Sequence, residues 1–233
     1  MSTAQDTGIS SPEVVELILA HLPMRDLLVT APRVSKMWNA TTLTPPLQCV
    51  LFCQPDPSDW RPLRNPLSME LFPPFFAPKG PHGRWPGDAE SIAKMPWANA
   101  TQAFRHPGHP DASWRRMLIV QPPAATLIVT QISHWQEGDF QSQATVNYDD
   151  TSSPGLRMGA LYDLAVPLID RPASSFYVSW PGHDTVPCEH ELILMACYTM
   201  QCTGGRRVLD RRFRIDGPGE SVELVESDDS EEE

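Results

Sequence analysis

Residues Ser11–Phe52 read SPEVVELILAHLPMRDLLVTAPRVSKMWNATTLTPPLQCVLF and decide the fold of the N-terminal part of the chain. Ser10 or Ser11 can cap a helix here, and Pro12 suits its first position, where the missing N–H has no partner to lose. Apolar residues then recur at helical spacing: Val14, Val15, Leu17, Ile18, Leu19 and Leu22. They cover an arc of roughly 200°, which predicts a strongly apolar helix.

A second helix is predicted directly after the first. Pro23 cannot continue the first helix, so the chain turns there. Asp26 falls in the first turn of the next helix, and Leu27 and Leu28 follow it. Pro32 is expected to break or kink this second helix.

A third helix is predicted to carry Val34, Met37 and Trp38 on one side, at the spacing i, i+3, i+4. Pro45 and Pro46 are expected to end the helical run. Together the three helices carry more apolar surface than they can bury among themselves, which indicates a docking element. The alternative is a helical hairpin that forms one end of an ordinary core.

The same residues resemble the F-box in three elements that occur in the family's order. The elements are Pro12 with Ile18, Leu19 and Leu22; then Asp26, Leu27 and Leu28; then Val34, Ser35, Lys36, Met37 and Trp38. F-boxes dock on the Skp-type adaptor of SCF (cullin–RING) ubiquitin ligases, while the rest of the chain holds a protein substrate. The resemblance therefore implies a substrate-receptor subunit of the cytoplasm or nucleus that performs no chemistry itself.

The resemblance also implies which side chains bind the adaptor, through helix-in-groove recognition by apolar anchors. The expected adaptor-binding residues are Pro12, Ile18, Leu19, Leu22, Leu27, Leu28, Val34 and Trp38. Some of them must instead hold the three helices together. Two other interpretations stay open: an interaction protein that works outside the SCF complex, and a small hydrolase whose N-terminal helices are only structural.

The charge of the chain argues against a nucleic-acid-binding surface, which needs clustered Lys and Arg. The net charge of the 233 residues is −11, and six of the negative charges lie among the last eight residues. Residues 227–233 are expected to form a disordered acidic tail. Ser227 and Ser230, each followed by acidic residues, are candidate phosphoacceptors in it.

No stretch of the sequence approaches the roughly 20 apolar residues of a membrane-spanning helix, so no membrane partner is expected. Residues 1–9 have neither the basic nor the apolar part of a secretory signal and are expected to be disordered. The five cysteines are an odd number, which suits free thiols in a reducing compartment.

Residues 53–103 form a proline-rich connecting segment that is expected to be partly ordered. Proline prevents long helices and central strands here, but a flexible linker would be poor in aromatic residues. This segment contains Trp60, Phe72, Phe75, Phe76, Trp85 and Trp97. We expect these aromatics to pack onto the surface of the following domain. A proline-rich ligand for SH3- or WW-type domains is the alternative.

Residues 104–226 carry the pattern of an α+β domain with a mainly antiparallel sheet and one or two helices. The strands are expected at Thr126–Trp135, Ala144–Tyr148, Ser175–Trp180, His190–Cys202, Arg211–Ile215 and Ser221–Glu226. Leu156–Ile169 is expected to be helical, and Gly204-Gly205 to turn the chain. Segments of this domain resemble those that follow the F-box in a large group of fungal proteins: Ala112–Leu118, Gln121–Pro123 and Gly155–Asp163.

Two other features of this domain bear on its function. A mixed polar and aromatic set either lines a recognition surface or fixes loops through Arg–Asp pairs and Trp packing; it consists of Trp114, Arg115, Arg116, Arg157, Tyr162 and Asp163. Cys188, His190, Cys197 and Cys202 contain zinc-ligand types, but their spacing fits no C-x-x-C knuckle. Neither a nucleophile elbow nor a phosphate-binding glycine loop occurs, so no cofactor and no catalytic site are expected.

Overall fold

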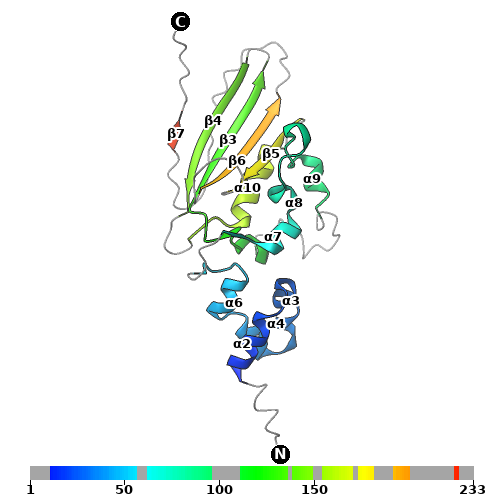
Figure 1. Ribbon diagram of the computed structural model, residues 1–233, viewed down its shortest axis with the longest axis vertical. Helices are drawn as coiled ribbons and strands as arrows, with labels where there is room; N and C mark the ends of the chain where they lie inside the picture. The colour runs from blue at the N-terminus through cyan, green and yellow to red at the C-terminus, as the bar shows by residue number, and fades with distance from the viewer. Residues whose placement is uncertain are drawn as a thin grey trace, which may run out of the picture.

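A computed structural model describes residues 11–56, 62–95, 111–135, 138–148, 154–169, 173–180, 191–199 and 223–225. Its described part has an N-terminal helical module (residues 11–51) and an α+β body (the described residues from 62 onward). Figure 1 shows the helical module at one end of an elongated molecule, with the sheet of the body running away from it. The predicted α+β class is confirmed.

The helical module contains five short helices where three were predicted. They are α2 (Pro12–Ala20), α3 (Met24–Val29), α4 (Ala31–Val34), α5 (Lys36–Thr41) and α6 (Pro45–Val50). The second predicted helix is interrupted at Thr30, and Pro32 lies in the first turn of α4, so the predicted break occurs just before Pro32. The prediction that Pro45 and Pro46 end the helical run is wrong, because both lie in the first turn of α6, where proline loses no hydrogen bond.

The predicted third helix is divided at Ser35. Val34 ends α4, and Ser35 has an extended backbone with φ of −160°. Its hydroxyl accepts a hydrogen bond from the backbone N–H of Trp38 at 3.2 Å and so caps the start of α5. Val34 therefore does not share a helix with Met37 and Trp38, because capping by a serine competes well with continuing the helix.

Six apolar side chains form the core of the helical module. They are Val15, Leu19, Leu27, Ala31, Leu47 and Leu51. At the start of α2, Ser11 occupies the capping position, but its hydroxyl donates to the Glu13 carboxylate instead of accepting a backbone N–H. The predicted serine cap is therefore present in position only.

The body is built on a five-stranded mixed sheet with the strand order β5-β6-β3-β4-β7. The strands are β3 (Thr126–Trp135), β4 (Gly138–Asn147), β5 (Ser175–Ser179), β6 (Glu191–Thr199) and β7 (Glu223–Val225). Three of the four pairings are antiparallel, as predicted, whereas β3 and β6 run parallel. The predicted strand Arg211–Ile215 and the Gly204-Gly205 turn lie outside the described residues.

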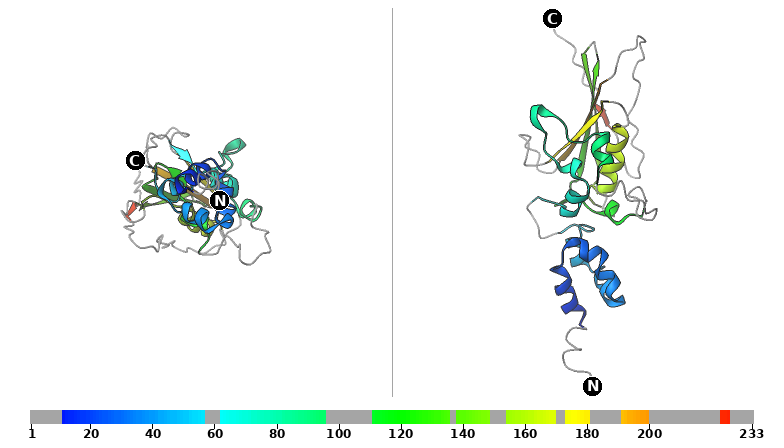
Figure 2. Two further views of the ribbon diagram at one scale, coloured as in Figure 1. Left: turned by 90° about the horizontal axis from the view of Figure 1, so that it is seen from below. Right: turned by 90° about the vertical axis from the view of Figure 1, so that its right-hand side faces the viewer.

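One face of the sheet packs against helices to form the body core. The helix α10 (Met158–Leu168) contacts β5 and β6, and its Leu161 and Ala165 lie in the same cluster as Leu127, Leu192 and Phe176. Figure 2 shows α10 beside the sheet when the molecule is turned by 90°. The predicted helix in this region is confirmed, with Pro167 near its end.

The proline-rich segment supplies much of the body core. Its elements are β1 (Leu63–Arg64), α7 (Pro66–Leu71), α8 (Pro73–Phe76), the 3-10 turn η1 (Pro81–Gly83) and α9 (Ala89–Ala93); η3 (Ser113–Arg116) and β2 (Val120–Gln121) follow. Phe72, Phe75 and Phe76 lie inside the core. The prediction that they pack onto the surface of the domain is wrong for these three residues. Proline at the first turn of α7 and α8 starts these helices instead of preventing them.

Candidate protein-binding surface

The helix α2 carries an apolar stripe that the fold leaves uncovered. Val14, Leu17 and Ile18 are 38%, 67% and 41% exposed, whereas Val15 and Leu19 are buried in the module core. At 100° per residue, the three exposed side chains span about 100° of the helix, beside the buried face. We name these three residues the α2 stripe. Its spacing of i, i+3, i+4 is the spacing with which a helix enters an apolar groove.

Charged side chains border the α2 stripe. Glu13 and Glu16 lie on the same helix. The hydrogen bond from Ser11 lowers the pKa of the Glu13 carboxyl, and a backbone hydrogen bond acts in the same direction. Glu13 therefore stays ionised to lower pH than an ordinary glutamate. An apolar centre with a charged border is the usual anatomy of a protein-binding surface.

The eight predicted adaptor-binding residues divide into three groups by burial. Leu19 and Leu27 are fully buried in the module core, so they hold the helices together. Leu22, Leu28 and Trp38 are half-buried and pack against that core. The exposed members of the set are Pro12, Ile18 and Val34. A partner that binds the module as folded has the most access to the third group and less access to the second.

Five exposed apolar side chains of the module lie outside the predicted adaptor-binding set. They are Val14, Leu17, Val29, Leu43 and Val50. Val14 and Leu17 belonged to the apolar arc of the first predicted helix, so the sequence carried a signal for them. Leu43 lies between α5 and α6 and has no periodic pattern around it, so only the fold reveals its exposure.

Exposed apolar side chains concentrate on the helical module. Among the described residues, nine large hydrophobic side chains are exposed; seven belong to the module and only Leu63 and Met69 to the body. Isolated exposed hydrophobic residues are ordinary, so the number of them on one small module makes it the candidate interaction site of the described residues.

The mixed polar and aromatic set of the body stabilises the fold. Trp114 is buried and lies 5.5 Å from the Tyr162 ring, edge to face. Arg115 forms an ion pair with Asp163, which joins η3 to α10. Burial, together with the charge of Asp163, raises the pKa of the Tyr162 hydroxyl. These contacts match the structural interpretation of the set and leave its aromatic faces occupied.

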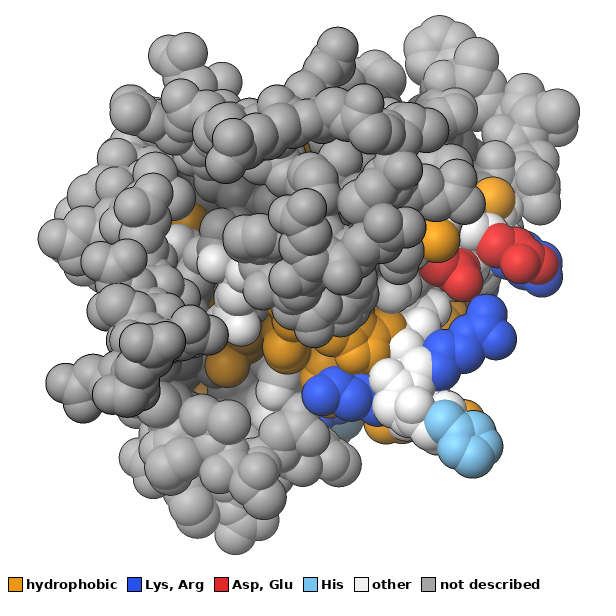
Figure 3. Space-filling model, turned by 90° about the horizontal axis from the view of Figure 1, so that it is seen from above, with side chains coloured by type: hydrophobic (Ala, Val, Ile, Leu, Met, Phe, Trp, Pro, Cys, Tyr) orange, Lys and Arg blue, Asp and Glu red, His pale blue; other side chains and the backbone are white. Residues whose placement is uncertain are grey.

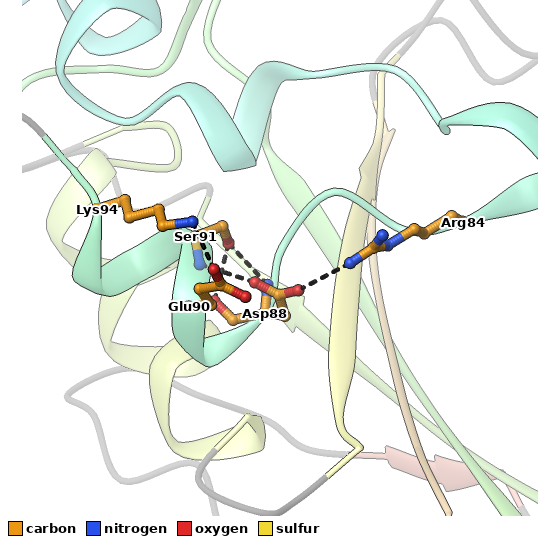
Figure 4. A network of polar contacts seen from close by, with 5 residues as sticks. All are labelled: Arg84, Asp88, Glu90, Ser91 and Lys94. Atoms are coloured by element: carbon orange, nitrogen blue, oxygen red, sulfur yellow. Dashed lines mark hydrogen bonds and ion pairs between the residues drawn. The ribbon is translucent and has the colours of Figure 1, made fainter.

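A second polar cluster surrounds the start of α9 (Figure 4). The Asp88 carboxylate accepts from the Ser91 N–H at 2.7 Å, and the Ser91 hydroxyl accepts from the Asp88 N–H at 2.8 Å. Arg84 lies 3.7 Å from the Asp88 carboxylate, and Lys94 pairs with Glu90. Asp88 and Ser91 form a capping box at the start of α9. Each charged side chain of the cluster has an oppositely charged neighbour, so the cluster has a structural role.

The end of the body that lies farthest from the module has a mixed surface. In Figure 3, its described side chains include an orange hydrophobic area beside Lys and Arg side chains, with Asp and Glu side chains near the edge.

Within the described part of the chain, no three His, Cys, Asp or Glu side chains are grouped so as to hold a metal ion. In that same part, no helix combines the length and apolar character needed to cross a membrane. The candidate phosphoacceptors Ser227 and Ser230, and the zinc-type residues Cys188, His190 and Cys202, lie outside the described residues. Comparisons with protein-family models, curated proteins and solved structures found no match for this chain.

Proposed function

We propose that this chain is a substrate-receptor subunit of an SCF-type ubiquitin ligase, acting in the cytoplasm or nucleus. The helical module would bind a Skp-type adaptor and, through it, a cullin, while the body would hold a protein substrate. The proposal rests on the three F-box-like elements of residues 12–38. The observation that carries it is the α2 stripe, which leaves apolar side chains at groove-binding spacing without a partner.

The exposed apolar side chains of the module would supply much of the affinity of such a complex. Burying a Val, Leu or Ile side chain contributes about 1.5–3 kcal/mol when the whole side chain leaves water. Association costs roughly 4–15 kcal/mol in lost freedom of motion. Because its side chains are only partly exposed, the α2 stripe alone would contribute a binding free energy near the lower end of that cost. Val34 and the half-buried Leu28 and Trp38 would then supply the remaining affinity.

The test is binding of the full chain to a purified Skp-type adaptor, measured by calorimetry. Ile18→Asp should weaken binding at least tenfold, because a charge in an apolar groove is left without a partner. Ile18 is exposed, so the variant should keep the stability of the wild type. Leu19→Asp would be a poor test, since it breaks the module core.

Met69→Asp is the matched control. Met69 also lies on a helix and is also 41% exposed, but it belongs to the body. The Met69→Asp variant should bind the adaptor with the affinity of the wild type. Failure of the wild-type chain to bind any adaptor at micromolar concentration would refute the proposed function.

A further inference from the structure

The helical module and the body meet at a compact connection that we call the joint. It consists of Leu51, Phe52 and Cys53 on the module side, and of Leu118, Gln121 and Arg157 on the body side. Figure 1 shows the chain passing from α6 into the body at this level.

Two consecutive residues of the joint belong to two different cores. Leu51 is buried in the module core, and Phe52 is buried in the body core. Phe52 has a positive φ of 57°, which a bulky L-residue adopts only when its surroundings enforce it. The two side chains can enter separate cores because this backbone conformation turns the chain sharply between them.

Hydrogen bonds from the body hold the backbone on either side of Phe52. The Leu118 N–H donates to the Phe52 carbonyl at 2.7 Å. The side-chain amide of Gln121, itself buried, donates to the carbonyls of Cys49 at 3.1 Å and Gln54 at 2.9 Å. One glutamine therefore binds the chain both before and after the turn.

Side chains around the joint are shared between the two parts. Leu28 and Cys53 contact both cores, and Met24 of α3 packs against the body core. Arg157 donates to the Cys53 carbonyl at 3.4 Å, and Arg25 pairs with Glu70 at 3.5 Å on the surface. The exposed ion pair contributes little, so the buried contacts dominate.

We propose that the joint fixes the helical module and the body as one rigid unit, with Gln121 as its positioning residue. A rotation of the module about residues 51–53 would pull Leu51 or Phe52 out of its core and break the hydrogen bond from Gln121 to the Cys49 carbonyl, while the bond to Gln54 anchors the chain after the turn. Given the proposed function, the joint holds whatever the body binds at a fixed distance and angle from the adaptor.

The test uses residual dipolar couplings of the full chain in solution. Alignment tensors are fitted separately to the amides of residues 11–51 and to those of the body. In the wild type, the two tensors should have the same magnitude and orientation, as expected for one rigid unit. A smaller or differently oriented tensor for the module in the wild type would overturn the proposal.

Gln121→Leu removes both hydrogen-bond donors at similar side-chain volume and is expected to lose the shared tensor. Gln48→Leu is the matched control, because the Gln48 amide donates to the Thr42 carbonyl at 2.8 Å within the module. It should keep the shared tensor. If Gln121→Leu also keeps it, Gln121 is not the positioning residue.

A second readout is the rate at which iodoacetamide alkylates Cys53, whose thiol is half-buried in the joint. Gln121→Leu should raise this rate and Gln48→Leu should not; equal rates in both would also count against the role of Gln121. Both measurements use the chain without adaptor. If the wild type binds no adaptor but shows one shared tensor, the proposed function is refuted, whereas the proposal that the joint makes the module and the body one rigid unit is upheld.

Discussion

Gly87 contacts the body core through its backbone. Its N–H donates to the Phe176 carbonyl at 3.1 Å, and its carbonyl accepts from the Phe176 N–H at 2.6 Å, so the residue adds a single bridge to the edge of β5. A Cβ atom at Gly87 would lie 2.3 Å from the Phe176 ring, which is itself fully buried. Only a residue without a side chain fits between β5 and this turn.

We therefore predict that Gly87→Ala destabilises the protein by about 1–3 kcal/mol, the usual cost of overpacking a core. Gly80→Ala is the control, since a Cβ there meets its nearest atom at 3.4 Å. That variant should be neutral, or more stable by about 0.4–1 kcal/mol through the loss of unfolded-chain entropy. Urea unfolding of both variants measures the difference, and equal midpoints would contradict the prediction.

The element α2 shows how closely a core face and a binding face can adjoin on nine residues. The sequence does not distinguish its buried apolar residues from its exposed ones, because a wide apolar arc does not indicate which part of it packs against the other helices. The fold divides the arc: Val15 and Leu19 face inward, and the α2 stripe faces out.

This division predicts opposite results for two leucines of α2. Leu19→Ala should cost about 2–5 kcal/mol, as expected for a large-to-small change in a core. Leu17→Ala should change the free energy of unfolding by no more than about 0.5 kcal/mol, as at other exposed positions. Both values come from chemical denaturation of the full chain. A large loss for Leu17→Ala would show that the stripe is covered in the free protein.

Among the elements, regular strands were predicted best. The bounds of β3 agree to the residue, because Thr126–Trp135 is rich in β-branched and aromatic residues. Residues 138–143 of β4 lie ahead of the predicted strand Ala144–Tyr148. All of them except Phe140 are polar or glycine, and only the hairpin pairing with β3 makes them a strand. The predicted third helix is divided because the Ser35 hydroxyl caps α5. The free-energy difference between capping a new helix at Ser35 and continuing the old one is small, so the sequence does not decide between them.

For the whole molecule, the sequence identified the α+β class but not which strands are neighbours. Alternation marks a strand without naming its partner, so the parallel pairing of β3 with β6 could not be foreseen. The contacts of the joint could not be predicted from the sequence for the same reason. Gln121 and Arg157 are ordinary polar residues in the sequence, and only the fold brings them to the end of α6.

The body core extends across the predicted domain boundary at residue 104. Phe52, Leu67, Phe72, Phe75, Phe76 and Met95 precede that boundary and are buried in the core. We predict that a fragment of residues 104–233 lacks fixed tertiary packing and that a fragment of residues 52–233 keeps it. Near-ultraviolet circular dichroism separates the two results. A cooperative thermal transition in the shorter fragment would contradict this prediction.

The position of Phe52 between two cores has a consequence for the order of events during synthesis. The module core closes with Leu51, so it needs no residue made later. Gln121 and Arg157 come 72 and 104 residues after the carbonyls of Cys49 and Cys53 that they bind. At about 5–20 residues per second, the ribosome makes them roughly 4–20 s later. A nascent chain therefore displays its α2 stripe before its orientation to the body is set.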